Sequence, residues 1–80
     1  MVFFTTETIG GRYPSMYYGL VHGLGISTEG NFGEAVNKAN TSIEQAAERN
    51  GANAIIGIRY ETTSVGRNII VHAYGTAVTE

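Results

Sequence analysis

The chain has 80 residues, a formal net charge of −2, and neither cysteine nor aspartate. These features exclude disulfides, thiolate metal ligands and a Ser-His-Asp triad. The lysines and arginines are scattered, which argues against a nucleic-acid surface, and no apolar run approaches the roughly 20 residues of a membrane span. We expect one domain over residues 1–80, soluble and cytoplasmic, with no nucleic-acid or membrane partner.

The small size of the chain limits the fraction of its surface that a single copy can bury. A domain of about this size buries only roughly 60% of the surface that its unfolded chain exposes, so it is marginally stable by itself. The composition is 42% hydrophobic and only 15% charged. We therefore expect other copies of the chain to cover part of the surface of each copy.

Two strands are predicted before the helix. Val2 to Thr6 is β-branched and aromatic, which is typical of a short strand, and a turn is predicted at residues 8–12. Met16 to Ile26 predicts a longer strand with a glycine-rich face. The glycines of that face are Gly19, Gly23 and Gly25. They indicate either a bend or bulge, or a close approach by a helix or another subunit.

A helix is predicted from Asn31 to about Asn50. Asn31 is an N-cap acceptor with Glu34 three residues later, and Asn50-Gly51 is a typical C-cap. Small apolar residues recur at three- and four-residue steps and form one stripe. The stripe consists of Ala35, Val36, Ala39, Ile43, Ala46 and Ala47. Because alanine dominates it, the helix can lie close against a sheet.

The last third of the chain predicts an antiparallel hairpin. Its strands are expected at Ala54 to Thr63 and at Asn68 to Thr79, with a tight turn centred on Val65-Gly66. The element order is then ββαββ, which predicts a single α+β domain with one helix packed on an antiparallel sheet.

The turn sets the register of this hairpin. It would pair Tyr60 with Val71 and Arg59 with His72. One face of the first strand would then be uninterrupted and apolar, as a docked helix requires. That face would carry Ala54, Ile56, Ile58 and Tyr60.

The other face of the hairpin is the first candidate site. It would carry Arg59, Glu61, His72 and Tyr74, and Gly57 would leave room for the ring of Tyr74. One interpretation is a subunit interface or a solvated face that holds ordinary polar pairs. The other is a ligand or anion site, in which Arg59 supplies charge, His72 donates a hydrogen bond and Tyr74 offers a stacking surface.

His22 is the second candidate, in the middle of the second strand. It is either a hydrogen-bonded interior or interface histidine, or a metal ligand. Two histidines, His22 and His72, together with a carboxylate could hold zinc or a similar divalent ion. The carboxylates considered are Glu7, Glu29 and Glu61. We expect no catalytic residue and no enzymatic activity, because no nucleophile has a supporting motif.

The chain resembles the YbjQ-like family of small proteins described as heavy-metal-binding. Two blocks carry the resemblance, namely Gly51 to Ile58 after the helix and Tyr74 to Val78 at the end. Tyr18 to Gly23 in the second strand, Thr5-Thr6 and Gly10 also match, so the likeness covers nearly the full length. The connection from Gly25 to Gly33 is shorter than the family's usual insertion, and no cysteine is present for thiolate capture of a soft metal.

The resemblance implies an α+β subunit that assembles into a ring, typically a homopentamer, and it implies metal binding. On that basis we expect a non-enzymatic, ring-forming protein that binds a divalent metal ion or a small ligand at sites repeated around the oligomer. The alternatives are capture of an anionic small molecule such as a nucleotide at subunit interfaces, and a purely structural scaffold.

Overall fold

The computed structural model describes residues 1–6 and 13–80. It contains one helix and four strands: β1 (Val2–Phe3), β2 (Met16–Ser27), α1 (Phe32–Arg49), β3 (Ala54–Val65) and β4 (Asn68–Thr79). Each predicted element is present within a few residues of its expected bounds. The turn predicted at residues 8–12 lies outside the described residues. No helix in the described part of the chain is long and apolar enough to cross a membrane.

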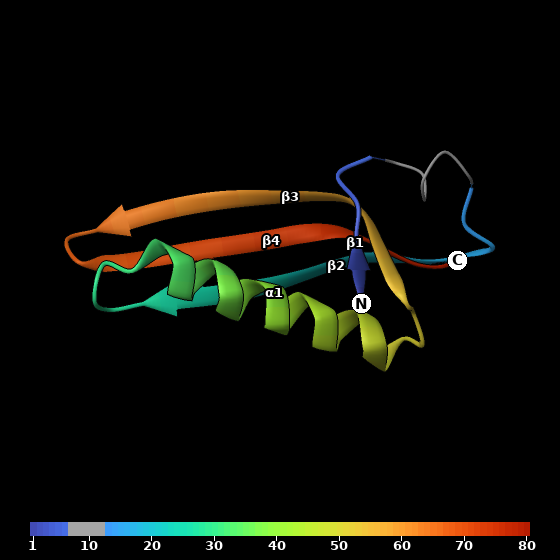
Figure 1. Cartoon of the computed structure of the whole chain (residues 1–80), viewed down its shortest axis with the longest axis horizontal. Coiled ribbons are helices and arrows are strands. Elements are labelled where there is room, and N and C mark those ends of the chain that lie inside the picture. The colour runs from blue at the N-terminus through green and yellow to red at the C-terminus, as the bar shows by residue number, and fades with distance from the viewer. Residues whose placement is uncertain (7–12) are drawn as a thin grey trace.

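The four strands form one sheet in the order β1-β3-β4-β2, and α1 crosses one of its faces (Figure 1). β4 pairs antiparallel with both β2 and β3. β1 pairs parallel with β3, through Val2 opposite Ala54 and Phe3 opposite Ile55. The sheet is therefore mixed, and the prediction of an antiparallel sheet was wrong at this edge. The α+β class with a single packed helix is confirmed.

Both ends of α1 follow from their capping residues. The Asn31 side chain accepts a hydrogen bond from the backbone N–H of Glu34 at 3.0 Å. At the other end Gly51 takes φ +83°, a left-handed conformation that favours glycine. Lys38 Nζ lies 2.8 Å from Glu34 Oε1, the expected i,i+4 ion pair.

The connection from β2 to α1 is organised by one buried side chain. Ser27 is fully buried, and its Oγ accepts hydrogen bonds from the backbone N–H groups of Glu29 and Asn31. A buried hydroxyl is tolerated here because it satisfies two N–H groups of a tight connection. The helix start is thereby tied to the last residue of β2.

The core lies between α1 and the sheet. The predicted alanine-rich stripe faces inward, with Ala35, Ala39, Ile43 and Ala47 buried. Residues of three strands complete this core: Val21, Ile55, Ile58, Val71, Ala73 and Ala77. A second, smaller cluster lies on the opposite face, where Phe4 packs on Ala54, Ile56 and Val78.

Two glycines of β2 allow the backbones of helix and strand to meet. A Cβ atom on Gly25 would overlap the backbone of Ala35 and Ala39, and one on Gly23 would overlap the backbone at Ile43. Gly19, by contrast, has φ +106° and lies where the register between β2 and β4 shifts. Both explanations offered for the glycine-rich face therefore apply, each to different glycines.

A bulge in β3 overturns the predicted register. β3 places Gly57 and Ile58 between the pairs Ile56–Thr76 and Arg59–Tyr74, whereas β4 has only Gly75 there. Gly57 takes φ +60°, so it makes the bulge rather than leaving room for an aromatic ring. A bulge shifts side chains from one face of a strand to the other.

The consequence is that the expected uninterrupted face does not exist. Ile58 lies in the helix-side core, but Ala54 and Ile56 lie in the small cluster on the opposite face. The hairpin turn is also displaced by one residue, since Val65 pairs with Asn68. Arg59 consequently faces Tyr74, not His72 as predicted, and Tyr60 faces Ala73.

The close approach of α1 to β2 gives a first prediction. Gly25→Ala should lower the free energy of unfolding by more than about 2 kcal/mol, because the added methyl group can be accommodated only by moving the helix backbone. Gly33→Ala is the matched control. Its Cβ meets only Asn31 Oδ1 at 3.5 Å, and alanine favours a helix, so it should be neutral or stabilising. Urea unfolding followed by circular dichroism measures both; equal stability of the two variants would contradict the packing described.

Candidate functional site

The face of the sheet that α1 does not cover is here called the open face. Along β2 the even-numbered residues from Leu20 are exposed, while the odd-numbered ones from Val21 are buried under the helix. The pairing of the strands places the matching residues of β3 and β4 on the same side. The open face thus carries Leu20, His22, Leu24, Ile26, Arg59, Glu61, Ile70, His72 and Tyr74. All five predicted site residues are among them.

The two histidines of the chain meet on this face. His22 of β2 lies opposite Tyr74 of β4, and His72 lies opposite Leu24, so the histidines are diagonal neighbours. Their ring centroids are 5.4 Å apart with the planes at 82°. The Tyr74 ring lies 5.8 Å from that of His72. Residues separated by fifty positions in the sequence therefore form one aromatic cluster of His22, His72 and Tyr74.

Glu61 and Arg59 border this cluster from β3. Glu61 lies opposite His72 and Arg59 lies opposite Tyr74. Both side chains are exposed, whereas those of His72 and Tyr74 are half-buried. The predicted members are thus brought to one face, although their pairing differs from the predicted one.

Arg59 makes structural hydrogen bonds that were not predicted from the sequence. Its Nη1 donates to the carbonyl oxygen of Thr5 at 2.8 Å and to that of Ile58 at 2.9 Å. Backbone hydrogen bonds hold the same segment, from Ile58 N to Phe4 O and from Gly57 N to Thr6 O. Arg59 therefore fastens the N-terminal segment to the bulge of β3, and one of its nitrogens is already engaged.

The possible metal ligands of one copy are few. No group of three or more histidine, cysteine, aspartate or glutamate side chains is placed to hold a metal ion within residues 1–6 and 13–80. Glu29 lies in the loop after β2, and Glu7 lies outside the described residues. His22 and His72 fit a transition-metal ion as imidazole donors. Two donors are fewer than the three or four protein ligands of ordinary zinc sites.

Exposed apolar side chains border the histidines along β2. Leu20 is 75% exposed, Leu24 53% and Ile26 47%. Together with His22 they occupy every second position of β2 from Leu20 to Ile26, and so lie on one face of the strand. Such a row of large aliphatic side chains is the kind of surface that another protein chain covers.

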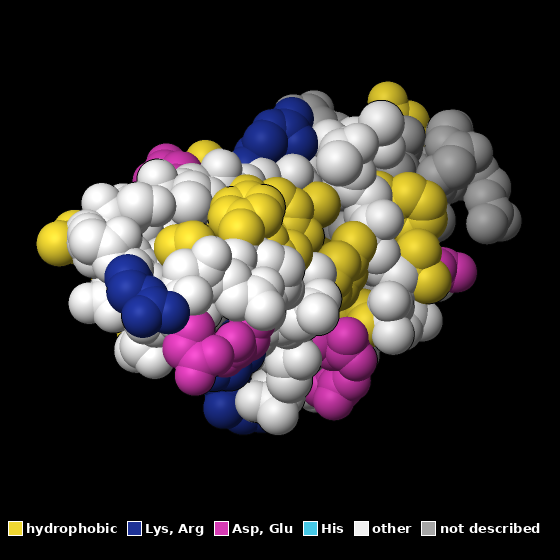
Figure 2. Space-filling view, turned by 60° about the vertical axis from the view of Figure 1, so that its left-hand side comes forward, with side chains coloured by type: hydrophobic (Ala, Val, Ile, Leu, Met, Phe, Trp, Pro, Cys, Tyr) yellow, Lys and Arg dark blue, Asp and Glu magenta, His cyan; other side chains and the backbone are white. Residues whose placement is uncertain are grey.

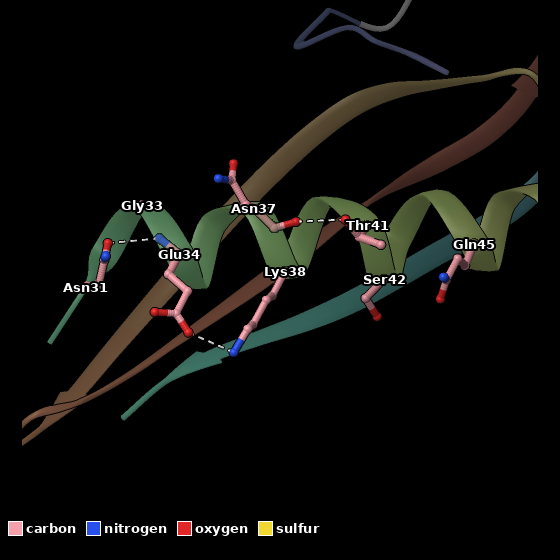
Figure 3. Close-up of a pocket in the computed structure, with 8 residues that line it drawn as sticks. All are labelled: Asn31, Gly33, Glu34, Asn37, Lys38, Thr41, Ser42 and Gln45. Carbon is pink, nitrogen blue, oxygen red and sulfur yellow. Dashed lines mark hydrogen bonds and ion pairs between the residues drawn. The ribbon is translucent and has the colours of Figure 1, made fainter. Parts of the chain in front are cut away.

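A second concave surface, which the sequence analysis did not identify, lies along the flank of α1 (Figure 3). It is a hollow of about 710 Å³, open to solvent. Its lining is polar and consists of Asn31, Gly33, Glu34, Asn37, Lys38, Thr41, Ser42 and Gln45. Lys38 Nζ donates to the carbonyl oxygen of Ile26 at 3.2 Å, so this flank borders β2. Only a helical periodicity of small polar residues could have indicated it.

One side of the molecule presents charged and apolar side chains without a visible histidine (Figure 2). Figure 2 shows acidic side chains gathered along the lower side of one view, with apolar side chains in its middle and no histidine visible. β2 itself carries no charged residue. Since the hollow is lined by residues of α1 and its N-cap, whereas His22 faces away from the helix, the hollow and the aromatic cluster are separate surfaces.

The contacts of Arg59 give a second prediction. Arg59→Ala should release the N-terminal segment and lower the free energy of unfolding by about 1 kcal/mol, since two charge-assisted hydrogen bonds, one exposed and one partly buried, are lost. Hydrogen exchange at Phe4 and Ile58 should become faster. Arg67→Ala, in the hairpin turn, is the control and should change neither quantity. Unchanged exchange in Arg59→Ala would show that the guanidinium does not hold the segment.

Comparison with known proteins shows relatives that match almost the whole chain. A UPF0145 protein of Francisella tularensis subsp. tularensis is 35% identical over 104 residues, which cover 98% of this chain and 97% of the relative. A UPF0145 protein of Methanothermobacter thermautotrophicus is 31% identical, with 98% and 94% covered. Because this chain supplies at most 80 of the 104 aligned positions, at least 24 positions of the Francisella relative have no counterpart here.

The fold is similar to that of a solved structure. A protein of unknown function from Pediococcus pentosaceus, assigned to the DUF74 family, superposes with a TM-score of 0.78 at 21% identity, over 99% of this chain and 96% of that chain. A family model with the description "Putative heavy-metal-binding" matches residues 29–80. The resemblance seen in the sequence is therefore confirmed, and the chain belongs to the YbjQ family.

Proposed function

We propose that the protein is a non-enzymatic, ring-forming homo-oligomer that binds a divalent transition-metal ion at the open face of each copy. His22 and His72 are the ligands that one copy supplies, and Tyr74 closes one side of the site. The convergence of the only two histidines of the chain at 5.4 Å carries this proposal. The description of the matching family model as heavy-metal-binding supports the choice of a metal ion as the ligand.

The chemistry of the donors supports a metal ion. Imidazole nitrogen is a favoured ligand of zinc, copper and nickel, and two imidazoles in one cluster can share an ion. The site lies on paired strands β2 and β4, which hold the two rings at a defined separation. Sites on regular elements keep their geometry better than sites on loops.

The surface supports assembly. The exposed leucines of β2 and Ile26 border the site, so that a contact covering them would also enclose the histidines. An oligomer repeats such a site around its symmetry axis. Five copies is the stoichiometry that the family resemblance implies, and cytoplasm is the location that the sequence predicts.

An alternative ligand is an anionic small molecule such as a nucleotide, attracted by Arg59. The geometry favours it less, because Nη1 of Arg59 already serves two backbone carbonyl groups. A purely structural ring is the remaining alternative. In the anion case a nucleotide would raise the melting temperature of the protein and would lose that effect in Arg59→Ala; in the structural case no small ligand would raise it.

Metal binding gives a third prediction. Titration of the tag-free protein with Zn²⁺ in a calorimeter should show binding that His22→Ala and His72→Ala each weaken at least about tenfold, since each removes one of few ligands. Arg49→Ala is the control, because it changes an exposed side chain in the last turn of α1, away from the open face. It should leave the Zn²⁺ affinity unchanged.

Native mass spectrometry of the same preparations reports the number of copies and any retained ion together. Unaltered Zn²⁺ affinity in both histidine variants would refute the proposed site. A well-folded species of one chain at micromolar concentration would refute the assembly.

A further inference from the structure

The sheet has an unpaired edge on each side within the described residues. β2 is the last strand in the order β1-β3-β4-β2 and pairs only with β4. On the other side β1 and the residues after it bond to β3 only as far as Ile58, so among the described residues the stretch 60–65 of β3 pairs with β4 alone. Unpaired backbone groups in an extended strand readily accept another strand.

From Leu20 to Ser27, beyond the register shift between Tyr17 and Gly19, β2 lacks the features that protect an edge strand. Natural proteins protect such edges with lysine, proline, inward charges or very short strands. β2 is 12 residues long and contains no proline and no charged residue. One of its carbonyl groups, that of Ile26, receives a hydrogen bond from Lys38. An edge of this length and composition indicates a strand partner.

The two edges of one copy cannot pair with each other, because β4 lies between them. They are related in a way that suits two copies, however. β2 and β3 are both antiparallel to β4 and so run in the same direction. A second copy placed beside the first in the same orientation would bring its β3 next to β2 as a parallel strand. The sheet would continue across the contact, with both helices on one side.

The hollow along α1 fits this arrangement. Gly25 and Thr62 both pair with Val71, and Ser27 and Ser64 both pair with Ile69, so these residues lie at matching levels. The side chains of Thr62 and Ser64 of the second copy would then pack against the flank of α1, beside β2. Their side chains are small, polar and uncharged, and most of the hollow is lined by side chains of the same kind.

The same contact would supply the missing metal ligand. Glu61 and Leu24 both pair with His72, so Glu61 lies at the level of Leu24. Leu24 is two residues from His22 along β2. In its own copy Glu61 lies on the far side of β4 from His22, and no set of three ligands is formed within the described residues. In a neighbouring copy it would lie directly beside β2.

We propose that β2 of one copy pairs with the 60–65 edge of β3 of a second copy, and that Glu61 of this second copy completes the metal site of His22 and His72. The inference deepens the proposed function and rests on it. The contact is head-to-tail, so repetition pairs every edge and can close a ring. Pairing β2 with β2 would instead leave the β3 edge and Glu61 unused.

Disulfide trapping tests the contact without reference to metal. The chain has no cysteine, so a double variant Ile26→Cys/Thr63→Cys forms disulfides only between the introduced residues, and the single variants identify which of these positions meet. Within one copy they are two strands apart, roughly 9.5 Å, which is beyond the roughly 7 Å limit of a disulfide. Leu24→Cys/Thr63→Cys tests the same contact with the register staggered by two residues. Oxidation should give a ladder of covalent oligomers on a denaturing gel.

The single variants are the controls and should remain monomeric on that gel. Dimers of Ile26→Cys alone would show that β2 pairs with β2 and would overturn the inference. It would equally be overturned if both double variants stayed monomeric on the gel while sedimentation showed the native assembly. In either case the Zn²⁺ affinities of the histidine variants still decide the proposed function separately.

Mixing of variants tests the shared site. Glu61→Gln should weaken Zn²⁺ binding at least about tenfold, as His22→Ala does. When the two variants are unfolded and refolded together, about a quarter of the contacts of a head-to-tail assembly join an intact histidine pair to an intact Glu61. Tight Zn²⁺ binding should return at those contacts. No recovery in mixed assemblies, confirmed by native mass spectrometry, would show that Glu61 does not act across the contact.

Discussion

The close approach of α1 to β2 is the constraint on which the rest of the structure depends. Gly23 and Gly25 have no side chains, so the helix backbone lies directly against the strand. The alanines of the helix then fill a thin layer that larger side chains could not occupy. Close packing of this kind compensates for a chain too short to build a thick core.

This thin, one-sided core has a consequence for the opposite face of the sheet. A single helix covers only one face, and the small cluster around Phe4 covers only one end of the other. The large aliphatic side chains of β2 remain exposed together with His22. The candidate site is therefore not an enclosed pocket. It is part of the sheet face that α1 leaves exposed.

The central position of β4 explains why the histidines meet. β4 pairs with β2 on one side and β3 on the other, so its residues His72 and Tyr74 contact side chains from both strands. The hairpin turn sets which residues of β3 take part, because the pairing runs unbroken from Val65–Asn68 to Arg59–Tyr74 and so places Arg59 and Glu61 on the face of the histidines. The bulge at Gly57 turns Ala54 and Ile56, on its other side, to the same face. Arg59 is at the same time bound to the N-terminal segment, which couples the bulge to that segment.

Much of the fold could be predicted from local patterns. The capped helix with its alanine stripe, the approximate bounds of the strands and the face on which the candidate residues gather all follow from residue type and periodicity, because caps and amphipathic repeats act over a few neighbouring residues. The parallel pairing of β1, the bulge at Gly57 and the diagonal contact of His22 with His72 could not be predicted, since each depends on how distant strands align. Glycine tolerates a left-handed bulge, a turn or a close contact equally well, and only the tertiary structure decides which of these each glycine serves.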